Sequence, residues 1–130
     1  MAKSRSHATH PRLIFVADGP GNPENDQLLD RMIEAMGVTR SDVSICDVAS
    51  LEQQIHKFSP DIIIALGEAT AQTLLRNPTP ISSLRGNFHK YREILLMPTW
   101  HPADLLRNPA SKKEAWDDLK KVLAQLNQSR

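Results

Sequence analysis

Residues 95–109, which read LLMPTWHPADLLRNP, decide how the rest of the chain is interpreted. The apolar residues 94–97 predict a buried strand that ends at Pro98, because proline cannot donate a hydrogen bond to a neighbouring strand. Pro102 keeps His101 out of the helical region and suits the first position of a short helix. Open α/β sheets place their sites beyond the carboxyl ends of the strands. The sequence therefore predicts that His101 is presented on a rigid turn at this edge of a sheet.

The composition is that of an ordinary globular domain. With 130 residues, 40% hydrophobic and 24% charged, the chain can bury one core. A net charge of +1 does not by itself demand a nucleic-acid partner. No apolar run approaches the ~20 residues that span a bilayer, and no signal-peptide pattern opens the chain. We therefore expect a cytoplasmic protein without a membrane partner.

The cysteine and histidine content argues against a bound metal. Cys46 is the single cysteine, which excludes an internal disulfide and a cysteine-ligated zinc site or iron–sulfur cluster within one chain. The five histidines do not show metal-binding spacing. We therefore expect no metal and no other cofactor.

Apolar runs alternate with amphipathic stretches after the first ten residues. Residues 1–10 are polar and basic, which predicts a disordered basic tail before a domain over residues 11–130. The expected strands are residues 13–17, 42–48, 61–67 and 94–97, and the expected helices are residues 26–37, 51–58, 68–76 and 111–126, with a loop-rich stretch over 77–91. Strands that alternate with helices predict an α/β fold, a three-layer α/β/α sandwich with a four-stranded parallel sheet. Ser111 and Glu114 predict a capping box at the start of the last helix.

Two motifs carry a resemblance to a known family. The turn at residues 98–109, PTWHPADLLRNP, and the strand-to-turn junction at residues 17–21, ADGPG, resemble the signature motifs of the uracil-DNA glycosylase superfamily. The most similar branch is the iron–sulfur-containing one called family four. The resemblance implies a glycosylase fold that acts on DNA, with His101 as the hydrogen-bond donor to the leaving base. It leaves Asp18 as the candidate that holds the hydrolytic water.

The same comparison with the family exposes several losses. Gly19 stands where other branches carry the water-positioning Asp or Asn, and Asp47 stands where the family carries the Asn that selects uracil. The family-four loop whose Phe stacks on the flipped base is absent, and so are the cluster cysteines. At the base-recognition position, Asp47 would present an acceptor to the acceptor O4 of uracil. These losses predict a protein without efficient base excision.

Candidate DNA contacts surround the histidine motif. Leu105, Leu106 and Arg107 could supply the apolar wedge and the guanidinium that fill the gap left by a flipped base. Arg85 and Lys90 belong to a stretch with almost no acidic residues, which suits phosphate contacts. A solvated loop explains that stretch equally well, so both interpretations stay open.

A second resemblance fits the losses. The psi subunit of the bacterial DNA polymerase III holoenzyme has this fold without the enzyme's site, and residues 16–17, 28–36, 106–109 and 115–116 resemble its pattern. This likeness implies an adaptor in DNA replication or repair that binds DNA weakly or through a partner such as a clamp-loader or chi-like subunit. The alternative is a minimal uracil-DNA glycosylase that uses His101 and Asp18. A nucleotide-binding domain built on Gly67 is a third, less favoured possibility, because no glycine-rich phosphate loop is present.

Overall fold

The structure is a computed structural model that describes residues 11–18 and 22–128. The predicted tail at residues 1–10 and the position of Gly19 lie outside the described residues. The strands are β1 (Leu13–Val16), β2 (Val43–Cys46), β3 (Ile62–Leu66), β4 (His89–Tyr91) and β5 (Ile94–Thr99). The helices are α1 (Pro23–Met36), α2 (Val48–Phe58), α3 (Glu68–Leu75), α4 (Ile81–Leu84), α5 (Pro102–Arg107) and α6 (Lys112–Gln128), with 3-10 turns η2 (Arg40–Asp42) and η3 (Pro109–Ser111).

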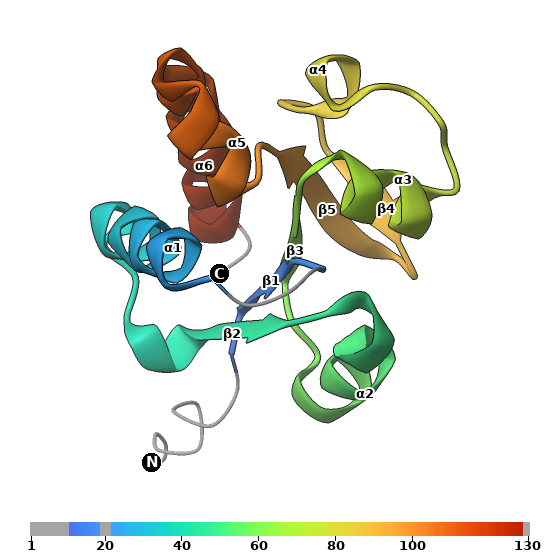
Figure 1. Ribbon diagram of the computed structural model, residues 1–130. Coiled ribbons are helices and arrows are strands. Elements are labelled where there is room, and N and C mark those ends of the chain that lie inside the picture. The colour runs from blue at the N-terminus through green and yellow to red at the C-terminus, as the bar shows by residue number, and fades with distance from the viewer. Residues whose placement is uncertain (1–10, 19–21, 129–130) are drawn as a thin grey trace.

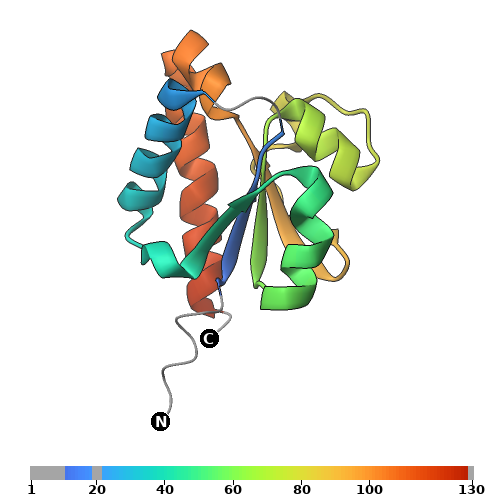
Figure 2. The same cartoon turned by 60° about the horizontal axis from the view of Figure 1, so that its bottom comes forward.

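The strands form a single sheet between two helical layers. The strand order is β2-β1-β3-β5-β4, in which the first four strands are parallel and β4 is antiparallel to β5. Helices α1 and α6 cover one face, and α2 and α3 cover the other (Figure 1, and turned in Figure 2). The predicted three-layer α/β/α class is therefore confirmed. The sheet has five strands rather than the four expected, because β4 adds an antiparallel edge.

The hydrophobic core explains why the strands read as continuous apolar runs. Successive side chains of a strand point to opposite faces of the sheet. Leu13 and Phe15 accordingly pack with residues of α1 and α6, whereas Ile14 and Val16 pack with residues of α2 and α3. All four of these side chains are fully buried. A parallel sheet covered on both faces favours apolar side chains on both faces of its central strands.

The extra strand, β4, is joined to β5 by a tight turn whose residue types do not predict a turn. A two-residue turn, Arg92 and Glu93, joins β4 to β5, and both residues have positive φ, of 51° and 68°. Two-residue hairpins favour this backbone but usually fill it with Asn-Gly or Asp-Gly, because other side chains are strained there. The Arg-Glu pair gives no such signal. The expectation of a loop over residues 77–91 was therefore wrong at its end, where β4 lies.

Strand β5 continues through Pro98, two residues past its expected end. The carbonyl oxygen of Thr99 accepts from the Gly67 N–H (2.9 Å), so Thr99 faces the end of β3. Backbone groups alternate in direction along a strand, so the nitrogen of Pro98 faces the other way, toward the β4 side. Strand β4 begins at His89, opposite Leu96, and so does not reach Pro98. The missing N–H of Pro98 therefore costs no ladder hydrogen bond.

Several helix starts differ from the sequence expectation. Helix α1 begins at Pro23, three residues early, because Asn22 caps it by accepting from the N–H groups of the first turn. Helix α2 begins at Val48 rather than at residue 51. The predicted capping box of the last helix is wrong. The Ser111 N–H donates to the carbonyl of Asn108, and the Glu114 carboxylate accepts from a tryptophan instead.

Candidate active site

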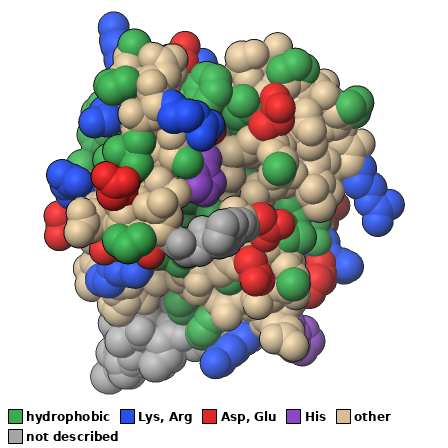
Figure 3. Space-filling view, viewed as in Figure 1, with side chains coloured by type: hydrophobic (Ala, Val, Ile, Leu, Met, Phe, Trp, Pro, Cys, Tyr) green, Lys and Arg blue, Asp and Glu red, His purple; other side chains and the backbone are tan. Residues whose placement is uncertain are grey.

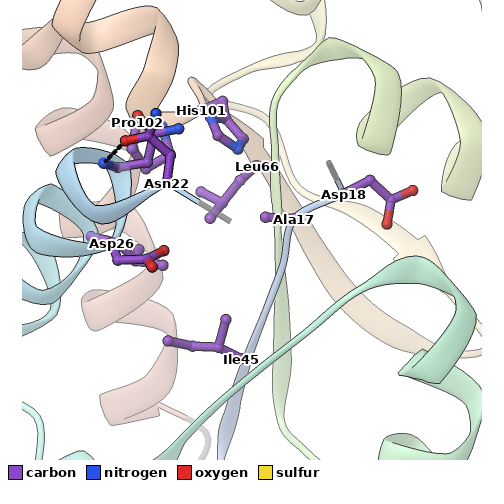
Figure 4. A pocket seen from close by; sticks show the side chains of 10 residues that line it. Ala17, Asp18, Asn22, Asp26, Ile45, Leu66, His101 and Pro102 are labelled. Carbon is purple, nitrogen blue, oxygen red and sulfur yellow. Dashed lines mark hydrogen bonds between the residues drawn. The ribbon is translucent and has the colours of Figure 1, made fainter. Parts of the chain in front are cut away.

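A cavity of about 120 Å³ lies at the carboxyl edge of the sheet, where β1 and β3 end. The chain leaves β1 toward α1 on one face and leaves β3 toward α3 on the other, which makes this edge the switch point of the sheet. The cavity is small, well under the ~300–1,000 Å³ of typical ligand pockets. The side chains that line it and are labelled in Figure 4 are Ala17, Asp18, Asn22, Asp26, Ile45, Leu66, His101 and Pro102.

His101 enters the cavity as the N-cap of α5. The ring Nδ1 of His101 accepts a hydrogen bond from the Ala103 N–H (2.9 Å). The backbone N–H of His101 donates to a carboxylate oxygen of Asp104 (3.2 Å). A ring nitrogen that accepts cannot carry a proton, so the neutral ring is protonated at Nε2. Burial lowers the pKa of His101. The charge of Asp104 opposes this shift and that of Arg107 adds to it. The ring is therefore a neutral hydrogen-bond donor that faces the cavity beside Leu66 (Figure 4).

Gly67 allows this approach of the histidine to β3. Its φ is +95°, and a Cβ built on it would lie 3.1 Å from the Cβ of His101. The Gly67 N–H is already engaged with the carbonyl of Thr99. Gly67 is therefore a packing surface for the imidazole, and its N–H is not free to bind a phosphate.

Asp18 lies at the cavity, but its carboxylate turns toward α2. One carboxylate oxygen accepts from the Val48 N–H (2.9 Å) in the first turn of that helix, and the side chain points away from His101 (Figure 4). Asp47 caps the same helix by accepting from the Ser50 N–H (2.9 Å) and is not among the residues that line the cavity. Both acids thus stabilise the positive end of the α2 dipole. The structure brings Asp18 and His101 to one cavity and leaves Asp47 outside its lining.

The cavity is lined by residues that the sequence analysis did not select. Asn22, Asn25 and Asp26 reach it from the first turn of α1, and Ile45 of β2, which is 40% exposed, closes another side. None of the described lining residues is Phe, Tyr or Trp. The Asn-Pro pair at residues 22–23 is a helix-start signal, and it could have placed α1 at this edge.

The histidine motif continues into a surface-exposed leucine and arginine. Leu106 is 43% exposed, whereas Leu105 is 1% exposed and packs with Leu28 and Ala115. The side chain of Arg107 is exposed and pairs with Asp104 (2.6 Å). Of the two leucines that the sequence offered as a wedge, the structure leaves only Leu106 accessible.

The predicted basic patch is not gathered beside this motif. Arg85 is engaged with the buried carboxylate of Asp118. Lys90 pairs in register with Leu95, near the start of β5 and so at the opposite end of that strand from His101, and lies 3.9 Å from Glu93. Acidic and basic side chains are interspersed over the face seen in Figure 3. This mixed surface gives phosphates no field of a single sign.

The donor groups of this chain do not fit an iron–sulfur cluster. Cys46 is the one cysteine, and its burial, together with the charges of Asp47 and Asp18, raises its pKa to about 11. A thiol with that pKa resists forming the thiolate that a cluster requires. Across residues 11–18 and 22–128, no three His, Cys, Asp or Glu side chains converge as metal ligands would. Over the same ranges, no helix has the length and apolar character to traverse a bilayer.

The fold and the cavity define an α/β protein whose site is a histidine turn at the switch point of a parallel sheet. The family model described as the uracil DNA glycosylase superfamily matches residues 6–120, and the chain belongs to that superfamily. The predicted family, and its family-four branch, are confirmed. Curated relatives include three type-4 uracil-DNA glycosylases. The enzyme of Thermotoga maritima is 30% identical to this chain, over an alignment that covers 78% of this chain and 69% of that enzyme. That of Saccharolobus solfataricus is 30% identical (74% and 58%), and that of Archaeoglobus fulgidus is 24% identical (85% and 74%).

Proposed function

We propose that the protein is a slow uracil-DNA glycosylase that hydrolyses the N-glycosidic bond of a base held in the switch-point cavity. The observation that carries this proposal is the neutral His101 ring, whose Nδ1 accepts from the Ala103 N–H and whose Nε2–H therefore faces the cavity. When the bond between C1′ and the base nitrogen breaks, its electron pair stays on the base and charge builds on a carbonyl oxygen. A preorganised donor at such an oxygen contributes about 10²–10³-fold in rate.

Water must then add to C1′ and lose a proton. Two acids, Asp18 and Asp26, line the cavity. We assign this step to Asp18, whose exposed carboxylate can accept that proton. To reach the water, the carboxylate has to give up its hydrogen bond to the Val48 N–H. That exchange makes water placement the weak step, which is one reason why we expect slow turnover.

Base binding is the second weak step. A flipped base is held by stacking and by hydrogen bonds to its edge, and each base–aromatic stack contributes about 1–3 kcal/mol. The described lining of this cavity offers apolar contacts from Leu66 and Ile45 in place of an aromatic ring. We therefore propose that substrate affinity, more than the histidine chemistry, separates this protein from an efficient enzyme.

The DNA-facing surface of the proposal lies beyond His101. Leu106 is the accessible apolar side chain that could occupy the space of the flipped base, and Arg107 could exchange its pairing with Asp104 for a phosphate. Because the surface charges are mixed and the net charge is +1, we expect the affinity to depend only weakly on salt.

The psi-like adaptor stays a second candidate, because the orientation of Asp18 and the lack of an aromatic ring in the described lining weaken the case for base excision. The relatives described above are named as glycosylases, and for that reason we rank the enzyme first. Binding of the purified protein to purified clamp-loader or chi subunits, measured by calorimetry, would favour the adaptor. Uracil release without such binding would exclude it.

The test of the proposed enzyme is single-turnover release of uracil. The protein, produced in a host that lacks its own uracil-DNA glycosylase, is incubated in excess over single- and double-stranded oligonucleotides that contain one uracil. Abasic sites are counted after alkaline cleavage. We expect slow, measurable release that falls about 10²–10³-fold in His101→Ala. The matched control is His56→Ala, which removes an exposed histidine from α2. Equal release by the His101→Ala variant would overturn the proposal.

A further inference from the structure

A buried ion pair lies directly behind the His101 turn. Arg85, in the segment that joins α4 to β4, donates to both carboxylate oxygens of Asp118 on α6, at 3.0 Å from Nε and 2.8 Å from Nη2. Asp118 is 0% exposed. Burying a carboxylate is costly unless it is paired and hydrogen-bonded, and a bidentate guanidinium meets that need with fixed geometry.

The Arg85–Asp118 pair places a carboxylate acceptor at the end of β5. The Oδ2 atom of Asp118 also accepts from the hydroxyl of Thr99 (2.6 Å), which is itself fully buried. Thr99 stands two residues before His101. Its carbonyl is held in turn by the Gly67 N–H, and Gly67 packs against the imidazole. Thr99 is thus fixed from α6 through its side chain and from β3 through its backbone.

The same guanidinium orients a second acid one helical turn away. Glu114 lies 3.7 Å from Arg85 Nη1, and its carbonyl accepts from Arg85 Nη2 (3.4 Å). The Oε1 atom of Glu114 accepts from the indole N–H of Trp100 (2.9 Å). Two acids on one face of α6 therefore take donors from two consecutive residues, Thr99 and Trp100, and the next residue is His101.

Gly86 makes room for this arrangement. It has a φ of +80°, and a Cβ built on it would lie 3.1 Å from the Oδ1 atom of Asp118. A side chain at this position would press on the carboxylate that Arg85 holds. The Arg-Gly pair at residues 85–86 is thereby explained as a unit that seats a buried acid.

We propose that Arg85 and Asp118 are positioning residues that, through Thr99, fix where the His101 ring enters the cavity. This inference rests on the proposed function and gives Arg85 a role other than the DNA contact expected from the sequence. Rotation or translation of the β5 end carries His101 with it, and a reacting group misplaced by about 1 Å can lose about 100-fold in rate. The ion pair acts on the reaction only through the turn, because Asp118 is fully buried and does not line the cavity.

The test compares Thr99→Val with Thr99→Ser, which leave the Arg85–Asp118 pair in place. The valine replaces the hydroxyl that donates to the carboxylate with a methyl group, whereas the serine keeps the hydroxyl. Protein with ¹⁵N-labelled histidine reports the His101 tautomer through its ring nitrogen shifts. In Thr99→Val we expect the His101 ring nitrogen shifts to move, because the displaced ring meets a different environment while its Nδ1 still accepts from the Ala103 N–H. In Thr99→Ser we expect the parent shifts. Unchanged His101 shifts in a folded Thr99→Val protein would overturn the inference.

Kinetics supply the second readout. If the protein releases uracil, Thr99→Val should lower the single-turnover rate about 10- to 100-fold with little change in the apparent affinity for the oligonucleotide. Asp61→Asn also breaks a contact of an Arg–Asp pair, but at the far edge of the sheet. It is the control for a change remote from the His101 turn and should change neither the nitrogen shifts nor the rate. The nitrogen shifts do not depend on turnover. If the unsubstituted protein released no uracil, the proposed function would be wrong, but the nitrogen shifts would still test this inference. A rate that falls equally in Asp61→Asn would contradict it.

Discussion

Two Arg–Asp pairs sit at opposite edges of the same sheet, and they differ in what surrounds them. Arg12 and Asp61 precede β1 and β3 at the amino edge, where their side chains are 28% and 39% exposed. Arg85 and Asp118 lie near the carboxyl edge, where the side chains are 18% and 0% exposed. Both pairs have close contacts, of 2.7 and 2.8 Å. Distance alone would rank them equal.

Burial makes them different. Water screens the exposed pair, and such pairs contribute about 0–1 kcal/mol. The buried carboxylate has given up its hydration, so removing Arg85 leaves its charge with the Thr99 hydroxyl and without a cationic partner. The amino edge can therefore vary at little cost, whereas the carboxyl edge ties stability to the geometry of the cavity. The predictions below run from the largest expected effect to the smallest.

Removal of the buried guanidinium should have the largest effect. Arg85→Gln leaves Asp118 buried without its cationic partner, and we expect a loss of about 3–5 kcal/mol in the free energy of unfolding. Urea unfolding followed by circular dichroism measures this loss. The matched Arg12→Gln variant should lose no more than about 1 kcal/mol. Equal losses at the two edges would break the comparison.

Acidification should affect the carboxyl edge selectively. Because the pKa of His101 is lowered in the folded protein, the unfolded chain takes up this proton at a higher pH. The folded state is therefore penalised as the pH falls through about 6.5, the ordinary histidine value, and the penalty levels off below the folded pKa. As the pH is lowered, the rate of uracil release should stay constant to below pH 6.5 and then fall about tenfold per pH unit. The rate falls because a protonated Nδ1 can no longer accept from the Ala103 N–H. An acid limb at or above pH 6.5 in the pH–rate profile would contradict the lowered pKa.

Relief of the strained hairpin should stabilise the protein without touching the site. Glu93, at the amino edge, has a φ of 68°, and a non-glycine residue with this backbone costs roughly 1–2 kcal/mol. Glycine removes this cost, but it loses more conformational entropy on folding, which offsets part of the benefit. Glu93→Gly should therefore raise the free energy of unfolding by about 1 kcal/mol. The His101 nitrogen shifts should stay the same. A changed tautomer in this variant would mean that the two edges are coupled.

The smallest effect is expected from the exposed acid. Asp61→Asn removes the charge partner of Arg12, which keeps its second hydrogen bond to the carbonyl of Leu126 (3.1 Å). We expect a change of less than about 1 kcal/mol, and high salt should shrink it further. Unfolding at low and high ionic strength measures both. A loss comparable with that of Arg85→Gln would show that exposure does not separate the pairs.

Much of the fold could be predicted because short-range patterns specify it. Continuous apolar runs marked β1, β3 and β5, a shorter and more polar run marked β2, and Pro102 after His101 marked the turn and the short helix of the site. The hairpin strand β4 was missed because Arg92 and Glu93 adopt a turn backbone that their residue types do not favour. The early start of α1 was missed because the turn-like residues before it hid the capping role of Asn22, whose side chain accepts from the Glu24 and Asn25 N–H groups.

The candidate site divides in the same way. His101 and Asp18 could be placed at one edge from the sequence, because both follow strands whose carboxyl ends meet. The orientation of Asp18 toward α2 depends on where a helix from another part of the chain begins. The exposure of Leu106 and the burial of Leu105 depend on which face of α5 packs against α1 and α6.

What the sequence by itself determined is the α/β class, the order of the main elements, the family and the histidine turn, since these follow from the periodicity and chemistry of neighbouring residues. Only the tertiary structure decided that Arg85 meets Asp118 across 33 residues of chain instead of facing DNA. The physical reason is that a charge is satisfied by whatever partner folding brings within reach, and burial decides how much that partner matters. Neither quantity is written in the local sequence.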